Sequence, residues 1–581
     1  MEKFYTTTAI DYVNGAPHIG HAYEKILTDV IYRHFTQRCD NTYFLTGTDE
    51  HGIKIQKTSA QNGVSPKEFC DMNAQKFKDA WKALDVEYSQ FIRTTDEQHE
   101  KVVQKIFKKL VEKGDIYKHA YEGLYCSGCE AFLSEKDLTE DGLCPDHLKK
   151  PEVVKEENYF FKLTKYKDAI IKHIKTHPDF IVPSFRANEV LNQLENIEDI
   201  SVSRVNSNVS WGIPVLGDDS QVIYVWIDAL SNYITAIGYD PDGSSEKFEK
   251  LWPANVQVIG KDILKFHSIY WLAILMALEL PLPEHILAHG WITIDQTKMS
   301  KSLGNGIDPI EIIDQYGADA LRFSVLSGTT MGNDIKYMPE KLEQASNFAN
   351  KIWNAAKFII MNTPDENKVK EFCHKVYNHE TKTYNPDLLT IEDKWILNKL
   401  DKLVADITRN IENYDLGIAI DKIYNFIWNE FCDWYIEMVK TRIYSENEET
   451  KVAVSDILNH VFGTSLKLLH PFMPFVTSEI YDKLVKYNEA DLIVSKWPTI
   501  REKFAFDDEE QTVEKIKEII TEIRNVRANM NIHPSKKSEL IFVTKKYENE
   551  IWEAKDFILK LGLGEKIVVQ KDKAGIPENA I

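Results

Sequence analysis

Several features that mark secreted and membrane proteins are scarce in this chain. Its 581 residues include only 7 cysteines, which excludes the disulfide framework of small secreted domains. No stretch approaches the roughly 20 apolar residues of a membrane-spanning helix, and the first residues, MEKFYTTTAI, lack the apolar core of a secretory signal peptide. We therefore expect a cytoplasmic protein without a membrane partner.

Positively charged residues are fewer than negatively charged ones. The 70 Lys and Arg residues face 90 Asp and Glu residues, which gives a formal net charge of −20. This balance argues against a general nucleic-acid coat or a protein that covers anionic membranes, although it leaves local basic patches open. The hydrophobic content of 43% is ample for buried cores, and the length predicts about three to five domains.

Strand-like and helix-like segments alternate along the first part of the chain. Lys3–Val13 is rich in Thr, Tyr, Ile and Val and predicts a strand. Apolar residues from Ile19 to about Arg38 recur at helical spacing. A strand, a helix, a strand and a helix are expected next, at residues 41–52, 66–84, 88–93 and 96–112. This alternation predicts an α/β fold with a parallel, Rossmann-type sheet and crossover helices.

The alternation breaks near Gly114 and later resumes. Three segments are expected to continue the sheet as strands: Ser220–Leu230, Asn255–Ile263 and His285–Asp295. The sheet is therefore split by an insertion of roughly 90–100 residues, a length that accommodates a small domain of its own. From residue 339 to 484 the pattern is almost wholly helical.

The pattern divides the chain into five segments. Residues 1–114 and 201–330 are expected to form the two halves of the catalytic sheet, and residues 115–200 the insertion. Residues 331–500 are expected to form an α-helical bundle. Residues 501–581 predict a small α/β segment with a helix at Thr512–Asn529 and a strand at Ser538–Val543.

The motif His18-Ile19-Gly20-His21 stands where the first strand gives way to the first helix. A helix start presents backbone N–H groups and the positive end of the helix dipole, which together favour phosphate. Gly20 lets a ligand approach the backbone closely. His18 and His21, three residues apart, project to one side and can donate hydrogen bonds to phosphate oxygens. Ordinary capping histidines would look the same.

A second motif, TKMSKSLGN at Thr297–Asn305, follows the last segment of the predicted sheet. Lysines on such a loop can neutralise the charge that develops on a triphosphate during displacement. A loop of Lys and Ser is in isolation most often a solvated loop. Together and in this order, the two motifs match the "HIGH" and "KMSKS" signatures letter for letter, and the chain resembles the class I aminoacyl-tRNA synthetases.

The resemblance implies an ATP site with Mg²⁺ accompanying the nucleotide. The catalytic residues it implies are His18, His21, Lys298 and Lys301. The ATP-binding residues it implies are His18, Gly20, His21, Gly260, Asp262, Lys298, Met299, Ser300, Lys301 and Ser302. Among these, the resemblance gives Asp262 a contact with the ribose.

Three further segments resemble the methionyl-tRNA synthetases in particular: Phe44–Gly52, Tyr224–Tyr233 and Gly260–Trp271. This resemblance covers about residues 1–330. It implies a methionine pocket formed by Ile10, Tyr12, Asp49, Trp226, Ala229, Tyr233, Ile263, His267 and Trp271. The chemistry agrees, because a polarizable thioether favours aromatic walls and Asp49 can pair with the substrate ammonium. Without the motifs, the aromatic residues would be ordinary core.

The insertion contains a zinc-binding pattern. Cys126 and Cys129 are separated by two residues, and after 14 more residues Cys144 and His147 show the same spacing. Two such pairs can surround one tetrahedral Zn²⁺ and leave no open coordination position, so the site is expected to be structural. The rest of the insertion is too short for the editing domain that valine or isoleucine enzymes need.

The helical half resembles the valyl-tRNA synthetases more than the methionyl ones. The resemblance rests on Gly332–Asn362, Ile427–Tyr444, Leu466–Leu484 and Ile523–Lys537. Asn354 falls where an anticodon-contacting Asn would align. Arg524 and Arg527 belong to a run of basic residues without an acid among them, which fits contact with tRNA phosphates. A solvated helix end explains that run nearly as well.

The function expected from the sequence is ATP-dependent ligation of L-methionine to tRNA(Met) in protein synthesis. The reaction proceeds through methionyl-adenylate and yields AMP and pyrophosphate. ATP, methionine and tRNA are the expected partners, and a monomer is expected. Two alternatives remain open: methionine activation with a valyl-type or unusual tRNA partner, and a regulatory paralogue that does not charge tRNA.

Overall fold

The computed structural model describes residues 3–126, 131–133, 138–139, 141–145, 149–294, 297–299, 305–365, 367–369, 377–378, 383–484, 492, 495–499, 506–577 and 580. The chain divides into two compact units, residues 1–340 and 341–581. Within the described residues, no helix is long and apolar enough to cross a membrane.

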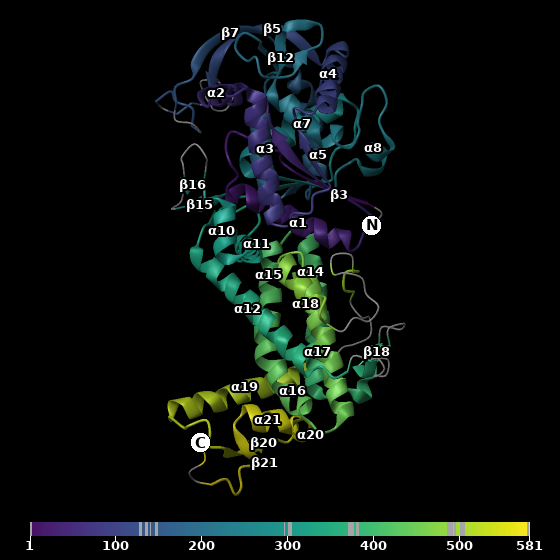
Figure 1. Ribbon diagram of the computed structural model, residues 1–581, viewed down its shortest axis with the longest axis vertical. Helices are drawn as coiled ribbons and strands as arrows, with labels where there is room; N and C mark the ends of the chain where they lie inside the picture. Colours follow the sequence, from purple (N-terminus) through teal and green to yellow (C-terminus); the bar gives the residue numbers. More distant parts are fainter. Residues whose placement is uncertain are drawn as a thin grey trace. The chain divides into compact units, whose positions relative to one another are not determined.

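A seven-stranded sheet forms the centre of the first unit (Figure 1). Its order is β2-β3-β1-β13-β14-β8, with β4 also paired to β3, and every pair is parallel. The strands are β1 (Lys3–Thr8), β2 (Asp11–Tyr12), β3 (Asn41–Asp49), β4 (Gln90–Arg93), β8 (Ile181–Val182), β13 (Val256–Gly260) and β14 (His285–His289). The interior strands are buried on both faces, as parallel sheets covered by helices are.

Helices cover this sheet and begin where the sequence supplies caps. Ser65 and Glu68 form a capping box with Pro66 in the first turn of α3 (Pro66–Ala83), and His18 caps α1 (Ile19–Thr36). The other helices of the unit are α2 (Ile53–Gln61), α4 (Glu97–Glu112), α5 (Lys167–Thr176), α6 (Arg186–Glu195), α7 (Val225–Thr235), α8 (Glu246–Leu251), α9 (Leu272–Ala277), α10 (Pro309–Tyr316) and α11 (Ala318–Leu326). Shorter helical turns are η2 (Leu163–Tyr166), η3 (Lys261–Ile263) and the π-helical η4 (Phe266–Trp271).

Small antiparallel sheets interrupt the chain between β4 and β13. One has the order β6-β5-β7-β9 and the other β10-β12-β11. Their strands are β5 (Ile116–Cys126), β6 (Ala131–Leu133), β7 (Glu152–Phe161), β9 (Ile200–Ser201), β10 (Ser203–Val205), β11 (Pro214–Val215) and β12 (Asp218–Ile223). The parallel sheet is thus interrupted along the chain, but the predicted bounds of the insertion, 115–200, do not match the sheets, because Ile181–Val182 is strand β8 of the parallel sheet and β10 and β12 belong to a small antiparallel sheet.

The prediction of a sheet strand at Ser220–Leu230 was wrong. Only its first residues are extended, in β12 of the small antiparallel sheet, and Val225–Thr235 is the helix α7. Residues Ile227–Thr235 are all buried. A continuous apolar run does not distinguish a buried helix from a buried strand, because neither shows periodicity.

The segment His285–Asp295 is also shared between two sheets. Its first five residues are β14, whereas β15 (Ile292–Ile294) belongs to a separate three-stranded sheet with β16 (Thr297–Lys298) and β17 (Ile335–Lys336). This second sheet carries the beginning of the TKMSKSLGN motif.

The second unit is a helical bundle followed by a small α/β segment (Figure 1). The bundle consists of α12 (Pro339–Asn362), α14 (Ile391–Glu412), α15 (Leu416–Asn425), the π-helical η7 (Phe426–Tyr435), α16 (Ile436–Ile443), α17 (Glu448–Leu469) and α18 (Pro474–Tyr481). The α/β segment consists of α19 (Asp507–Asn529), β20 (Ser538–Val543), α20 (Glu548–Glu553), α21 (Lys555–Leu561) and β21 (Gly564–Gln570), with β20 and β21 parallel. Between α12 and α14 lie β18 (Tyr377–Asn378), β19 (Thr383–Tyr384) and η6 (Pro386–Leu388).

Candidate active site

The first histidine motif is built around the start of α1. The Nδ1 atom of His18 accepts a hydrogen bond from the backbone N–H of Gly20 at 3.1 Å, and the Nδ1 atom of His21 accepts one from the backbone N–H of His18 at 3.1 Å. The two rings lie against each other, with their centroids 3.8 Å apart. Because each Nδ1 is an acceptor, the proton of each neutral ring must be on Nε2. Both imidazoles are therefore Nε2–H donors.

The position of the His18 ring, which caps α1, requires glycine at residue 20. A Cβ atom added to Gly20 would lie 2.8 Å from Cε1 and 2.9 Å from Nδ1 of His18. The sequence argument gave Gly20 the task of admitting a ligand to the backbone. The structure shows an additional reason, which is that only glycine lets the His18 ring fold over the first turn.

The segment after the lysine-rich motif meets this helix start. The backbone N–H of Ile19 donates to the carbonyl of Ile307 at 3.0 Å, and Gly306 lies beside the His18 side chain. The backbone N–H of Ile307 contacts the sulfur of Met299 at 3.5 Å. The fold thereby brings the two motifs together although about 280 residues separate them along the chain.

A cavity of about 370 Å³ lies at this junction, beyond the carboxyl ends of β1, β13 and β14. Such a crevice is the usual ligand site of an open parallel sheet. The predicted site residues that line it are Ile10, Tyr12, His18, Gly20, His21, Gly260, Asp262, Ile263 and Met299. The structure therefore gathers these predicted nucleotide residues and the first part of the predicted methionine pocket in one cavity.

Other predicted ATP-binding residues fall outside the described side chains. Lys298 is described only as backbone, where it pairs with Thr293 in the small sheet. Ser300, Lys301 and Ser302 lie outside the described residues.

Gly260 and Asp262 form a close pair at the end of β13. A Cβ atom on Gly260 would lie 2.7 Å from Oδ1 of Asp262, so a side chain there would displace the carboxylate. The indole N–H of Trp291 donates to the same Oδ1 at 3.2 Å. The carboxylate is thus held at the cavity wall, where the resemblance places the ribose.

The sequence argument missed the lining residues Asp11, Glu24 and His289 and their buried neighbour Lys25. Lys25 Nζ donates to Asp11 at 2.8 Å and to Glu24 at 2.9 Å, and Nε2 of His289 lies 3.0 Å from the other oxygen of Glu24. Burial alone would raise the pKa of Glu24, but Lys25 and His289 outweigh burial and lower it. The available signal was the adjacent charged pair Glu24-Lys25 inside the apolar stripe of a predicted helix.

Apart from Asp49 on β3, the remaining methionine-pocket residues lie on α7 and η4. His267 Nδ1 donates to the carbonyl of Ile263 at 3.0 Å, so its Nε2 accepts the hydroxyl proton of Tyr233 at 2.6 Å. Burial lowers the pKa of His267 to about 4, which keeps the ring neutral. Burial also raises the pKa of Tyr233 well above its ordinary value, so the phenol is neutral too.

Aromatic rings surround this pair. Trp226 stacks on Phe266 with centroids 3.7 Å apart, and Ala229 is buried on the same helix as Trp226. Trp271 is fully buried beside Tyr233, and its indole N–H donates to Gln257 at 3.0 Å. Asp49 ends β3, where its carbonyl accepts from the N–H of Val13 at 3.3 Å. Tyr233 is therefore in contact with both His267 and Trp271. The six predicted residues Asp49, Trp226, Ala229, Tyr233, His267 and Trp271 are not among those that line the cavity.

Two of the four predicted zinc ligands lie within the described residues. Cys126, at the end of β5, and Cys144 are both buried, and neither forms a disulfide. Cys129 and His147 lie outside the described residues. Among the described residues, no group of three or more side chains could hold a metal ion. The predicted site also needs Cys129 and His147, so it stays a prediction.

The predicted tRNA contacts differ in accessibility. Asn354 on α12 and Arg524 on α19 are exposed, and Arg524 Nε donates to the carbonyl of Leu561 at 2.9 Å. Arg527 does not fit the prediction of a phosphate contact. It is 6% exposed, and its guanidinium donates to Ser538 Oγ at 2.8 Å and to the carbonyl of Lys536. Its positive charge is used to fasten the loop after α19 rather than presented to solvent.

Comparison with known proteins extends this picture. A family model described as tRNA synthetases class I (M) matches residues 4–150 and 147–359, and one described as the anticodon-binding domain of tRNA ligase matches residues 393–542. The methionine–tRNA ligase of Thermotoga maritima is 39% identical over 491 residues, which is 83% of this chain and 75% of the relative. That of Caldanaerobacter subterraneus subsp. tengcongensis is 40% identical over 492 residues, which is 83% of this chain and 74% of the relative.

Solved structures show the same likeness. Mycobacterium tuberculosis methionyl-tRNA synthetase in complex with methionyl-adenylate aligns with a TM-score of 0.74 at 32% identity, over 83% of this chain and 94% of that chain. The apo form of the same protein aligns with a TM-score of 0.67 at 29% identity, over 83% of this chain and 92% of that chain.

Proposed function

The chain belongs to the class I methionyl-tRNA synthetases, and from this premise we propose that it joins L-methionine to tRNA(Met) through methionyl-adenylate. One observation carries the proposal. The start of α1 with its two Nε2–H donors, the Gly260–Asp262 pair and Met299 of the lysine-rich motif line one cavity at the end of the parallel sheet.

The first step is adenylate formation. A carboxylate oxygen of methionine attacks the α-phosphorus of ATP, the bond from that phosphorus to the bridging oxygen breaks, and pyrophosphate leaves. His18 and His21 donate from Nε2 to phosphate oxygens at the positive end of α1. Lys298 and Lys301 stabilise the charge on the departing pyrophosphate. Mg²⁺, which binds phosphate oxygens and water rather than a dedicated protein cage, would neutralise further phosphate charge.

Asp262 is assigned to the ribose. Its carboxylate lines the cavity and accepts a hydrogen bond from Trp291, and the lack of a side chain at Gly260 leaves room for it. A fixed carboxylate accepts hydrogen bonds from hydroxyl groups without a rotamer search. In the second step, the 3′-terminal hydroxyl of the tRNA attacks the carbonyl carbon of the adenylate, and AMP leaves.

Methionine is selected by the neutral Tyr233–His267 pair and the surrounding rings. The Tyr233 hydroxyl donates a hydrogen bond to His267, so the pocket has uncharged polar groups beside its aromatic walls. A polarizable thioether is suited to such walls. The Asp49 carboxylate is assigned to the ammonium group of the substrate.

A structural Zn²⁺ is proposed for the insertion. Cys126, Cys129, Cys144 and His147 would hold it, and the two thiols within the described residues are buried and outside any disulfide, as ligands of a closed site are. Metal analysis of the purified chain should give one zinc per chain. The variant Cys126→Ser should lose the metal, whereas Cys432→Ser, at a buried thiol of η7, should retain it.

The tRNA partner is the remaining choice. The helical half resembles valyl enzymes in sequence, yet matches over 83% of the chain to methionine–tRNA ligases extend beyond the 340 residues of the first unit. We therefore favour tRNA(Met), with Asn354 and Arg524 as exposed contacts on the helical unit. Because translation supplies the substrate tRNA, the enzyme is proposed to act in the cytoplasm.

A four-way aminoacylation assay tests the proposal. Methionine and valine are each offered with purified methionine-specific and valine-specific tRNA. Methionine on methionine-specific tRNA alone is the expected result. Methionine on valine-specific tRNA would establish the unusual-partner alternative. Adenylate formation without charging of either tRNA would establish the non-charging paralogue.

A further inference from the structure

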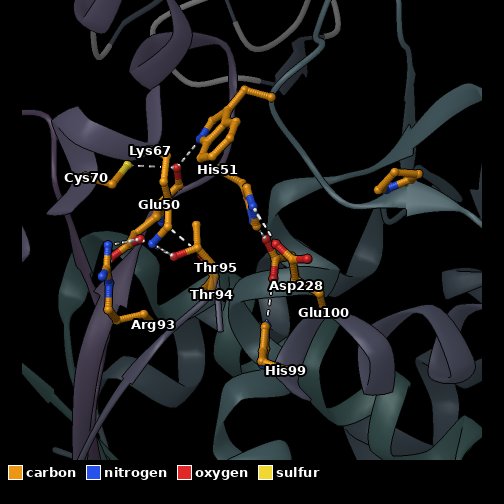
Figure 2. A network of polar contacts seen from close by, with 12 residues as sticks. Glu50, His51, Lys67, Cys70, Arg93, Thr94, Thr95, His99, Glu100 and Asp228 are labelled. Atoms are coloured by element: carbon orange, nitrogen blue, oxygen red, sulfur yellow. Dashed lines mark hydrogen bonds and ion pairs between the residues drawn. The ribbon is translucent and has the colours of Figure 1, made fainter. Parts of the chain in front are cut away.

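A second polar network lies outside the cavity that holds the nucleotide residues. Figure 2 shows its two parts, one around Glu50 and one around Asp228, meeting at the turn that follows β3. The turn comprises residues 49–52, and it begins with Asp49, the residue assigned to the substrate ammonium. The sequence argument assigned no role to the residues of this network, although Glu50, His51 and Asp228 lie within the segments Phe44–Gly52 and Tyr224–Tyr233.

Asp228 joins three elements. Its Oδ2 lies 2.7 Å from Nδ1 of His51 in the turn, and its Oδ1 lies 2.7 Å from Nε2 of His99 on α4. His99 in turn hydrogen-bonds through Nδ1 to the hydroxyl of Thr235 at 2.7 Å. Asp228 and Thr235 both belong to α7, so the chain of contacts leaves that helix, crosses to the turn and to α4, and returns to it.

The contacts are fully buried. Asp228 is 1% exposed, His99 2% and His51 4%. Burial would lower the pKa of His51, but Asp228 and, on α4, Glu100 raise it to about 10. Burial would likewise raise the pKa of Asp228, yet His51 and His99 hold it below its ordinary value. A buried ion pair with both carboxylate oxygens occupied has one geometry, because any displacement leaves a charge uncompensated.

The other part of the network fixes the same turn from the opposite side. Glu50 is fully buried and accepts from Arg93 Nε at 2.6 Å and Nη2 at 2.8 Å, and from Thr95 at 2.6 Å. The carbonyl of Glu50 accepts from the indole of Trp211 at 2.6 Å. Glu50 thus anchors the turn to β4, while His51 anchors it to α7.

Both anchored elements carry the methionine pocket. The turn includes Asp49, and the carbonyl of His51 accepts from the hydroxyl of Tyr12, which lines the cavity, at 3.3 Å. Helix α7 carries Trp226 and Tyr233 on either side of Asp228 in sequence. The contact between Asp228 and His51 therefore joins the turn beside Asp49 to the helix that carries Trp226 and Tyr233.

We propose that His51, Asp228 and His99 are positioning residues that hold the turn after β3 against α7 and thereby set the methionine pocket. The inference rests on the proposed function, because it concerns the pocket for that substrate. The three residues act through Asp49 and α7, and none of them is among the residues that line the cavity at the start of α1. The nucleotide residues lie on α1 and at the end of β13. Loss of the contacts among His51, Asp228 and His99 should therefore weaken methionine binding and leave ATP binding unchanged.

The test is steady-state pyrophosphate exchange with methionine and with ATP varied separately. In His51→Leu and Asp228→Asn, the KM for methionine should rise about 10- to 100-fold, the effect of misplacing pocket groups by about an ångström. The KM for ATP should stay within about threefold. His51→Asn should restore much of the methionine affinity, because the amide nitrogen of Asn replaces Nδ1, the atom that faces Asp228.

Asp393→Asn serves as the matched control. Asp393 is also a fully buried carboxylate with a cationic partner, Arg442 at 2.8 Å, and accepts from Tyr435 at 2.7 Å, but it lies in the helical unit. It should lower thermal stability to a similar degree and leave the KM for methionine unchanged. Thermal unfolding of every variant separates loss of fold from loss of positioning, and His99→Gln, which keeps a donor at the Nε2 position, provides a milder variant.

The outcomes are distinct. If wild type shows no methionine-dependent exchange, the proposed function fails and the inference with it. A second outcome is that wild type is active and the His51 and Asp228 variants lose stability, but their KM for methionine is no higher than that of Asp393→Asn. In that case the three residues have a purely structural role, and the inference alone is overturned. Calorimetric titration with methionine in the absence of ATP should show the same loss of affinity as the kinetics.

Discussion

Replacing Gly20 with Ala should abolish most adenylate formation while leaving stability nearly unchanged. The added Cβ would lie 2.8 Å from Cε1 and 2.9 Å from Nδ1 of His18, closer than real Cβ contacts. The neighbouring Gly306 confines the other side of His18, since a Cβ there would already lie 3.3 Å from Cβ of His18. The ring must therefore swing off the first turn of α1.

Two opposing terms decide the stability. The ring loses its hydrogen bond to the backbone N–H of Gly20, and loss of an N-cap costs about 0.5–2 kcal/mol. Alanine in place of a helical glycine returns about 0.5–1 kcal/mol. The net change is expected to be destabilising by about 1 kcal/mol or less.

Catalysis has no such compensation. Movement of the ring removes one Nε2–H donor from the phosphate site and disturbs the adjacent, tilted ring of His21. Loss of one preorganised donor costs about 2.7–4 kcal/mol of transition-state stabilisation, or about 100- to 1,000-fold in kcat. Pyrophosphate exchange and thermal unfolding measure the two effects on the same preparation.

Gly463→Ala in α17 is the matched control. A Cβ at Gly463 would meet Tyr481 at 3.9 Å, an ordinary contact. That variant should gain about 0.5–1 kcal/mol and retain full exchange activity. Exchange activity of Gly20→Ala within about threefold of wild type would refute the argument that the glycine serves the capping ring.

Three further predictions follow from the site. Lys301→Ala should slow adenylate formation far more than it weakens methionine binding, and equal losses in rate and affinity would count against a role in the transition state. Tyr233→Phe should cost about 1–3 kcal/mol of stability because it leaves the buried Nε2 of His267 without its donor; urea unfolding measures this, and an unchanged midpoint would contradict the assigned tautomer. The stabilisation from protonated His51 should be complete below pH 6.5 and disappear as pH rises toward about 10, because folding raises the pKa of His51. The difference in free energy of unfolding in urea between wild type and His51→Leu should therefore shrink across that range. A constant difference would show that the pair of His51 and Asp228 is not ionic.

Local signals were sufficient for much of the fold. Helical spacing predicted α1, and alternation of strands and helices predicted the split parallel sheet. They failed at the helix Val225–Thr235, because its residues Ile227–Thr235 are all buried and show no helical periodicity. They failed again at Arg527, because a run of basic residues carries no information about which of them is covered.

The sequence by itself determined the chemical types of the site. Two histidines at a helix start, a lysine-rich loop and an aromatic cluster are local facts, since capping geometry and hydrogen-bonding capacity depend on residues a few positions apart. Tertiary structure alone decided which distant groups meet. His289 reaches Glu24 across 265 positions and His51 reaches Asp228 across 177. The packing of helices on the parallel sheet brings such residues together, since Glu24 lies on α1 and Asp228 on α7. Burial and the partners then decide whether each side chain is charged or neutral.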